Sequence, residues 1–140
     1  MSRVFWDTNL FIYLIEDVSP RGKRVASLRE RMIERRDQLY TSAMTLGEVL
    51  VKPLETGNAA LARAYEEAIV GAAVVLPFGV DESRAYARIR RERSIRAPDA
   101  MQLACASTAG IDLFITNDDR LSNRIVEGVQ FVASLEAALI

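Results

Sequence analysis

The chain has 140 residues, of which 50% are hydrophobic and 26% are charged, and its net charge is −1. This length and composition predict a single globular domain over residues 1–140. There is no histidine, and Cys105 is the only cysteine. A Ser-His-Asp or Cys-His nucleophile and histidine general acid–base chemistry are therefore excluded, and a Cys/His zinc site has no adequate ligand set. Any hydrolytic chemistry must depend on carboxylates, which favours a hard, oxygen-preferring metal ion.

The sequence has no pattern typical of a membrane or secreted protein. No apolar run reaches the roughly 18–20 residues needed to span a bilayer. No basic segment leads into a long apolar one near the start. The lone cysteine fits a reducing compartment. We therefore expect a cytoplasmic protein with no membrane partner.

Short apolar segments alternate with amphipathic ones along the chain, the first typical of buried strands and the second of helices. In chain order, we expect a strand at 4–6, helices at 10–15 and 20–36, a strand at 38–41, helices at 45–51 and 59–70, a strand at 74–76, helices at 81–93 and 98–109, and strands at 113–116 and 130–132. Asp81 is the expected N-cap of its helix, and Ser134 could cap a short last helix.

This alternation predicts the α/β class, with a parallel sheet covered by helices on both faces. In such sheets, ligands bind beyond the carboxyl ends of the strands, where the strand order reverses. Polar residues that follow each strand are therefore the first candidates for a functional site.

Four acidic residues lie close to such positions. Asp7 directly follows the first strand, and Asp118 lies two residues after the strand at 113–116. Glu48 lies in the helix that follows the strand at 38–41, and Asp99 lies in the first turn of the helix at 98–109. We expect all four to face one rim of the sheet.

Each acid also has a purely structural interpretation. Asp7 could cap the next helix, and so could Asp118, for which Asp119 is an alternative. The stretch "TLGE", which ends at Glu48, matches the S/T-x-x-E capping box, and this alone favours a capping role. Asp99 suits the positive end of a helix dipole.

Taken together, the four acids indicate a cation site. Carboxylates that are close together repel one another and raise each other's pKa, so a cluster costs stability unless a cation offsets the charge. Mg²⁺ and Mn²⁺ take such oxygen ligands and keep several waters. One or two such ions can activate water and stabilise the charge on a phosphate during in-line displacement.

Four segments, "FWDTNLFIYLIE", "TSAMTLGEVL", "APDAMQLACA" and "FITNDDRL", occur in this order over nearly the whole chain. As an ordered set they resemble the PIN domain family, and in particular the bacterial toxin ribonucleases of the VapC type. The resemblance implies a three-layer α/β/α fold with a parallel sheet in the order 3-2-1-4-5. It also implies a Mg²⁺- or Mn²⁺-dependent endoribonuclease that cleaves RNA, a small antitoxin partner and a homodimer.

The same resemblance implies roles for particular residues. The family's acidic quartet is matched by Asp7, Glu48, Asp99 and Asp118. Of these, Asp7, Asp99 and Asp118 would hold the metal, directly or through water, and Glu48 would orient or help deprotonate the attacking water. The supporting polar positions are Asn9, Thr116 and Asp119.

An acidic pocket repels the RNA that it would cut, so cationic side chains should surround it. Arg93 and Arg96, in the approach to Asp99, are the candidate RNA contacts through phosphate. The alternative is a solvated helix face, because glutamates alternate with the arginines at i,i+4 spacing.

Other functions remain open from the sequence. The chain could be a PIN-type nuclease that processes RNA or single-stranded DNA without an antitoxin, or a metal- or partner-binding module without catalysis. A receiver-like phosphoacceptor domain would also place acids on a doubly wound sheet. Such a domain would need a lysine near the pocket, but the only lysines, Lys23 and Lys52, do not follow a late strand.

Overall fold

A computed structural model describes residues 1–16 and 19–138, and its strands form one five-stranded parallel sheet. The sheet order is β3-β2-β1-β4-β5, so the predicted α/β class and strand order are confirmed. The strands are β1 (Arg3–Trp6), β2 (Gln38–Ser42), β3 (Val74–Leu76), β4 (Leu113–Thr116) and β5 (Phe131–Ser134).

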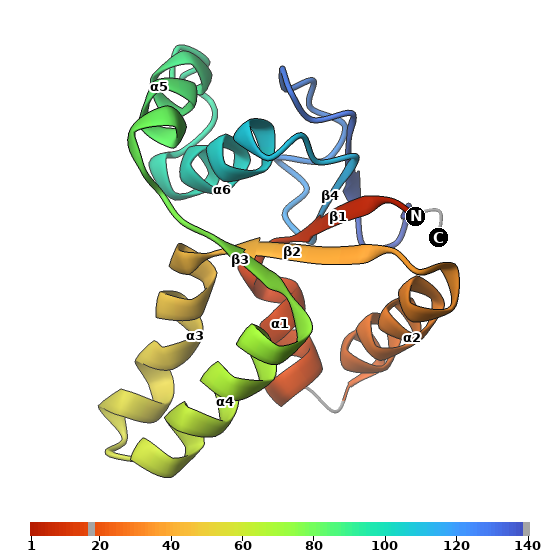
Figure 1. Ribbon diagram of the computed structural model, residues 1–140, viewed down its shortest axis with the longest axis vertical. Coiled ribbons are helices and arrows are strands. Elements are labelled where there is room, and N and C mark those ends of the chain that lie inside the picture. The colour runs from red at the N-terminus through yellow and green to blue at the C-terminus, as the bar shows by residue number, and fades with distance from the viewer. Residues whose placement is uncertain (17–18, 139–140) are drawn as a thin grey trace.

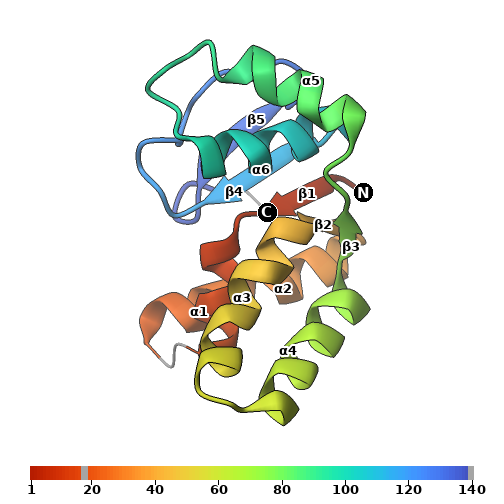
Figure 2. The same cartoon turned by 90° about the vertical axis from the view of Figure 1, so that its left-hand side faces the viewer.

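The helices form two layers, one on each face of the sheet, as Figures 1 and 2 show. One layer holds α1 (Thr8–Glu16), α2 (Pro20–Arg35), α3 (Ala43–Glu55) and α4 (Ala59–Ala72). The other holds α5 (Val80–Ile89) and α6 (Ala97–Thr108). The expected three-layer α/β/α arrangement is therefore present.

The alternation of side chains along β1 divides the core in two. Val4 and Trp6 are fully buried against α1, α2 and α3, whereas Phe5 points to the opposite face and packs with α6. The ring of Phe5 stacks on that of Phe114 in β4, with centroids 4.9 Å apart. Because a central parallel strand is shielded from water on both faces, Val4, Phe5 and Trp6 are hydrophobic without interruption, and only Arg3 at the start of β1 is exposed. The polar stretch that begins at Asp7 therefore marks the point where β1 leaves the core.

The strand order reverses between β1 and β4. The chain moves from β1 to β2 and β3 on one side, then crosses through α5 and α6 to β4 on the other side of β1. Trp6 of β1 pairs with Ile115 of β4, so the two strands end side by side. This is the edge at which open α/β sheets bind their ligands.

The expected helix at 81–93 is wrong at both ends. Gly79 is the N-cap of α5, and its N–H donates to Glu82 Oε1 at 2.9 Å, so Asp81 lies inside the first turn. The helix ends at Ile89, because the Arg90 guanidinium donates to the carbonyl of Ile95 at 2.6 Å and holds the following segment in a turn. The segment 90–95 is thus a connection between α5 and α6.

Two smaller expectations are also wrong. The N-cap of α3 is Ser42, whose Oγ accepts the N–H of Thr45 at 3.4 Å, so Thr45 lies inside the helix and is not the cap of a box with Glu48. Ser134 ends β5, and its Oγ accepts the N–H of Ala137 at 3.1 Å. That bond closes a turn, and no helix follows β5 as far as residue 138. In the described part of the chain, every helix is too short or too polar to cross a bilayer.

Candidate active site

Asp7 and Asp118 are joined through the hydroxyl of Thr116, the last residue of β4. The Asp7 N–H donates to the carbonyl of Ile115 at 3.0 Å, which places the residue at the end of the β1–β4 ladder. Thr116 Oγ1 donates to Asp7 Oδ2 at 2.8 Å and accepts the N–H of Asp118 at 3.0 Å. The structure thus places the first and last candidate acids on neighbouring strand ends, as expected from the strand order.

The carboxylate of Asp7 is the most buried of the four, since the residue is only 8% exposed. Burial raises its pKa, because leaving water disfavours the charged form. Hydrogen bonds from Thr116 and from the Thr8 N–H oppose this rise, whereas the negative charges of Asp99 and Asp118 add to it. The raised pKa means that the fold disfavours the ionised form of the Asp7 carboxylate.

Glu48 on α3 and Asp99 on α6 approach Asp7 from different layers of the protein. Burial and then the charge of Asp7 raise the pKa of Glu48, and a hydrogen bond from the Thr8 hydroxyl opposes the rise. Burial and then the charge of Asp118 raise the pKa of Asp99. The four acids that the sequence singled out are therefore close enough to repel one another.

Arg120 pairs with Asp118 through both carboxylate oxygens. Its Nε lies 3.0 Å from Oδ1 and its Nη2 lies 2.7 Å from Oδ2. This hydrogen-bonded arginine lowers the pKa of Asp118 below its usual range. Asp119 is exposed and makes no hydrogen bond or ion pair within residues 1–16 and 19–138. The structure therefore points to Asp118, not Asp119, as the member of the acidic cluster.

The carboxylate groups of the cluster are suitable ligands for a divalent cation, but their present positions do not surround one. Its ligands would all be carboxylate oxygens, which suit Mg²⁺ and Mn²⁺. Among the described residues, however, no three acidic or cysteine side chains already surround a common metal position. Arg120 supplies positive charge to Asp118, and Arg96 Nε lies 3.9 Å from Asp99 Oδ2. Cation binding would require Asp118 to exchange its arginine for the ion.

A buried polar network beneath the acids was missed from the sequence. The Gln102 amide on α6 donates to Thr8 Oγ1 at 3.0 Å and to Thr45 Oγ1 at 2.7 Å. Its carbonyl oxygen accepts the Ser42 hydroxyl. Gln102 is 2% exposed, and the network links α6 to the N-terminal turns of α1 and α3. The signal available was a glutamine inside the apolar stretch "DAMQLACA", which a buried helix tolerates only if the amide is hydrogen-bonded.

Of the remaining candidates, Asn9 and Arg96 lie at the margin of the cluster and Arg93 does not. Asn9 Oδ1 accepts the N–H of Asn117 at 3.4 Å, a long bond that ties α1 to the segment after β4. Arg96 faces Asp99, as its ion-pair distance shows. Arg93 is not brought to the acids and instead lines a separate exposed hollow with Arg90 and Arg91.

Comparison with known proteins agrees with this architecture. Residues 4–125 match the sequence profile of the PIN domain. No protein of curated function matches the chain in sequence.

Three solved toxin–antitoxin structures share the fold, at identities too low to show more. VapBC2 from Rickettsia felis bound to a DNA fragment from its promoter has a TM-score of 0.74 and 12% identity over 94% of this chain and 97% of that chain. A toxin–antitoxin complex from Klebsiella pneumoniae has a TM-score of 0.65 and 19% identity over 90% and 94%. VapBC-5 from Mycobacterium tuberculosis has a TM-score of 0.63 and 23% identity over 95% and 99%.

Proposed function

Because the chain belongs to the PIN domain family, a family of nucleases, we propose that it is a metal-dependent endoribonuclease that hydrolyses RNA phosphodiester bonds. One observation carries the proposal: three acids from separate elements have raised pKa values at the carboxyl edge of the sheet, with burial and mutual repulsion as causes. Such a cluster costs stability, and perturbed acids gathered in this way are typical of functional sites.

The side chains divide into two roles. Asp7, Asp99 and Asp118 would hold Mg²⁺ or Mn²⁺, and such an ion would activate water and stabilise the charge on the phosphate. Glu48 would orient the attacking water or help to deprotonate it, and its raised pKa suits its carboxylate to take a proton. The Thr8 hydroxyl, itself held by Gln102, restrains the Glu48 carboxylate. Thr116 restrains Asp7 in the same way.

A toxin role is the biological setting that we propose for this activity. The structures of similar fold come from toxin–antitoxin complexes, and the sequence resembles VapC-type toxins. A small antitoxin would then cover the acidic cluster in the cytoplasm, and the toxin would form a homodimer. Growth arrest on expression, relieved by a short protein encoded next to this one, would support the toxin role. Normal growth at full cleavage activity would instead favour an RNA-processing nuclease.

The activity itself is tested with purified protein and labelled RNA. We expect cleavage in Mg²⁺ or Mn²⁺, none after chelation by EDTA, and restoration when the ion is returned. A single-stranded DNA of the same sequence distinguishes a ribonuclease from a general nuclease. Metal binding without cleavage of the RNA or of the DNA would favour a metal-binding module without catalysis.

A further inference from the structure

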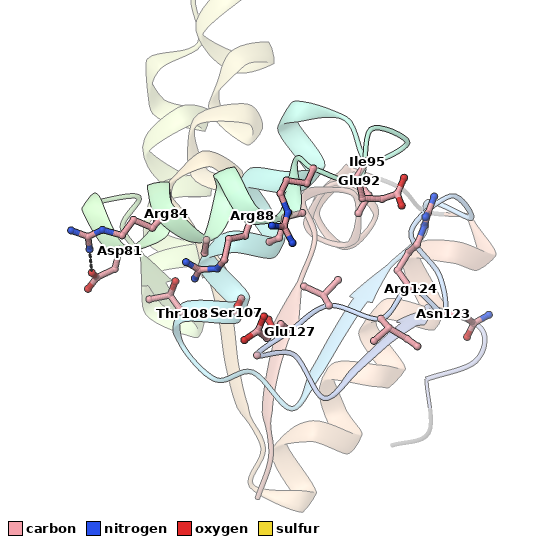
Figure 3. A pocket seen from close by; sticks show the side chains of 16 residues that line it. Asp81, Arg84, Arg88, Glu92, Ile95, Ser107, Thr108, Asn123, Arg124 and Glu127 are labelled. Carbon is pink, nitrogen blue, oxygen red and sulfur yellow. Dashed lines mark hydrogen bonds and ion pairs between the residues drawn. The ribbon is translucent and has the colours of Figure 1, made fainter.

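A hollow of about 770 Å³ lies outside the acidic cluster, between α5, α6 and residues 123–128. Figure 3 shows Arg88 and Glu127 facing this space from opposite walls, with Arg124 and Glu92 together at one end. The volume lies within the range of about 300–1,000 Å³ that is usual for small-ligand sites.

The wall formed by residues 123–128 is fixed to α6. Gly128 has a φ of +87°, and a Cβ there would lie 2.5 Å from Ser107 Oγ and 2.8 Å from the Ser107 carbonyl, so only glycine fits. Ser107 Oγ also donates to the carbonyl of Glu127 at 2.6 Å. At the other end, Arg124 donates to Ser94 Oγ at 2.8 Å. The hollow is thus built by specific contacts on both sides.

The lining combines an apolar floor with a charged rim of four arginines and three acids. Ile95 and Val126 are buried and present carbon to the hollow. Arg84 is paired with Asp81 at 2.9 Å.

Unlike Arg84, which is paired with Asp81, Arg88 and Arg91 have guanidinium groups without a partner among the described residues. Both are exposed, and neither makes a hydrogen bond or ion pair with any described residue. The Glu127 carboxylate likewise has no such partner within residues 1–16 and 19–138. Within the described part of the chain, the hollow therefore offers two unpaired guanidinium groups on one wall and an unpaired, exposed carboxylate on the opposite wall.

Two contacts connect this hollow to the acidic cluster. Arg124 Nε donates to the carbonyl of Arg120, the residue that pairs with Asp118. Ser94, which Arg124 also contacts, lies two residues before Arg96, the partner of Asp99. Arg124 and Ser94, which belong to one end of the hollow, are therefore linked to the two arginines that pair with Asp118 and Asp99.

Resting on the proposed function, we propose that this hollow is a nucleotide subsite for the RNA strand that the acids cut. An unpaired base enters it and lies on the apolar floor, while its flanking phosphates contact Arg88 and Arg91. Sequence-specific proteins read single-stranded RNA through splayed bases in this way. The Glu127 carboxylate accepts a hydrogen bond from an exocyclic amino group, so the subsite prefers the bases that carry one (adenine, cytosine and guanine) to uracil.

The phosphate contacts are tested by binding of short labelled single-stranded RNA in EDTA, where no cleavage occurs. The double variant Arg88→Ala/Arg91→Ala should bind about tenfold more weakly. The slope of log K against log salt should become shallower by about 0.7 for each lost phosphate contact. Arg63→Ala, an exposed arginine of α4 in the opposite layer, is the matched control and should bind like wild type. An unchanged affinity and salt slope in the double variant would overturn the proposal.

The base contact is tested with oligonucleotides that differ only in the base. Wild type should prefer cytosine- or adenine-rich RNA to uracil-rich RNA by about 3- to 10-fold. Glu127→Gln, which keeps the side-chain shape, should reduce this preference while the salt slope stays the same. Equal binding of all sequences by wild type would contradict the subsite.

These outcomes are separable from failure of the proposed function. If the protein does not cleave RNA but the variants shift binding as stated, the subsite stands and the ribonuclease assignment fails. If the protein cleaves RNA and neither variant affects binding, the subsite is wrong. Dissociation of a dimer by the double variant, with RNA binding intact, would show that the hollow is a contact between two copies, which also overturns the subsite.

Discussion

Arg120 holds Asp118 in a bidentate pair, with Nε 3.0 Å from Oδ1 and Nη2 2.7 Å from Oδ2. The backbone N–H of Arg120 donates to the same Oδ1 at 3.0 Å, so Arg120 alone supplies three hydrogen bonds to the Asp118 carboxylate. The consequence is an asymmetry in the cluster: the pKa of Asp118 is lowered, whereas burial raises those of Asp7 and Asp99. Arg120 is therefore the internal counter-ion of Asp118, and a divalent cation bound at the cluster would have to compete with it.

Removal of Arg120 should strengthen cation binding. In Arg120→Ala, Asp118 no longer has to give up a charge-assisted pair, and the cluster loses one positive charge. We expect the apparent affinity for Mg²⁺ to increase about fivefold, read from the dependence of Tm on Mg²⁺ concentration. Arg63→Ala is the control. An affinity that is unchanged or weaker would show that Arg120 does not oppose the ion.

Asp118 and Asp119 are distinguished by a pair of matched variants. Asp118→Asn should lower the rate of RNA cleavage by at least about 10- to 100-fold, because removal of a group that only supports a metal ligand already has an effect of this size. Asp119→Asn should stay within about twofold of wild type, because its side chain is exposed and makes no contact with the cluster. The reverse ranking would transfer the role to Asp119.

Gln102 should act as a positioning residue beneath the acids. Gln102→Leu leaves the hydroxyls of Thr8 and Thr45 without their donor, and we expect a loss of about 1–3 kcal/mol in the free energy of unfolding. Because Thr8 also restrains Glu48, kcat should fall while KM changes little. The measurement is made on samples shown to be folded by circular dichroism. An unchanged kcat would mean that the network serves stability alone.

The pH dependence of stability should depend in part on Asp37, which is remote from the acidic cluster. Burial acts to raise its pKa, but hydrogen bonds from the Ser2 N–H and from Arg35 outweigh it, so the pKa is lowered from 3.8. A lowered native pKa gives stability that is complete above the unfolded value and is lost as the pH falls through the native one.

Asp37→Asn should therefore cost about 1–3 kcal/mol near neutral pH, the range expected for hydrogen bonds to a charged group. The difference from wild type should shrink below about pH 4, because protonated Asp37 no longer holds its donors as strongly. Urea unfolding at several pH values measures it. Asp81→Asn, which breaks an exposed pair, should cost little at any pH. A pH-independent difference for Asp37→Asn would contradict the assignment.

The fold and the acids were predictable because each follows from a local rule. Apolar runs such as Val4 to Trp6 mark strands buried on both faces, and parallel strands bring their carboxyl ends to one edge. That rule placed Asp7 and Asp118 at the carboxyl edge, and the strand order implied by the resemblance to the PIN family placed their strands side by side. The two residues follow adjacent strands as expected.

The partners of these acids were not predictable in the same way. Gln102 meets Thr8 across 94 residues of chain, and its role depends on which side chains the helices bring together. The helix predicted at 81–93 is too long at its C-terminal end, because the pattern of arginine and glutamate continues past Ile89. In the structure α5 ends at Ile89, and Arg90 donates to the carbonyl of Ile95. Tertiary contacts override local propensity at both places.

The central claim is that the cluster of Asp7, Glu48, Asp99 and Asp118 performs the chemistry, and its most direct test is single-turnover cleavage of labelled RNA in Mg²⁺ by Asp7→Asn and Asp99→Asn. We predict a loss of at least about 100-fold in each variant, with a Tm no lower than that of wild type, because burial already disfavours the charged form of both acids. Glu67→Gln, an exposed position of α4 in the opposite layer, should cleave like wild type. Full cleavage by both folded variants would contradict the account.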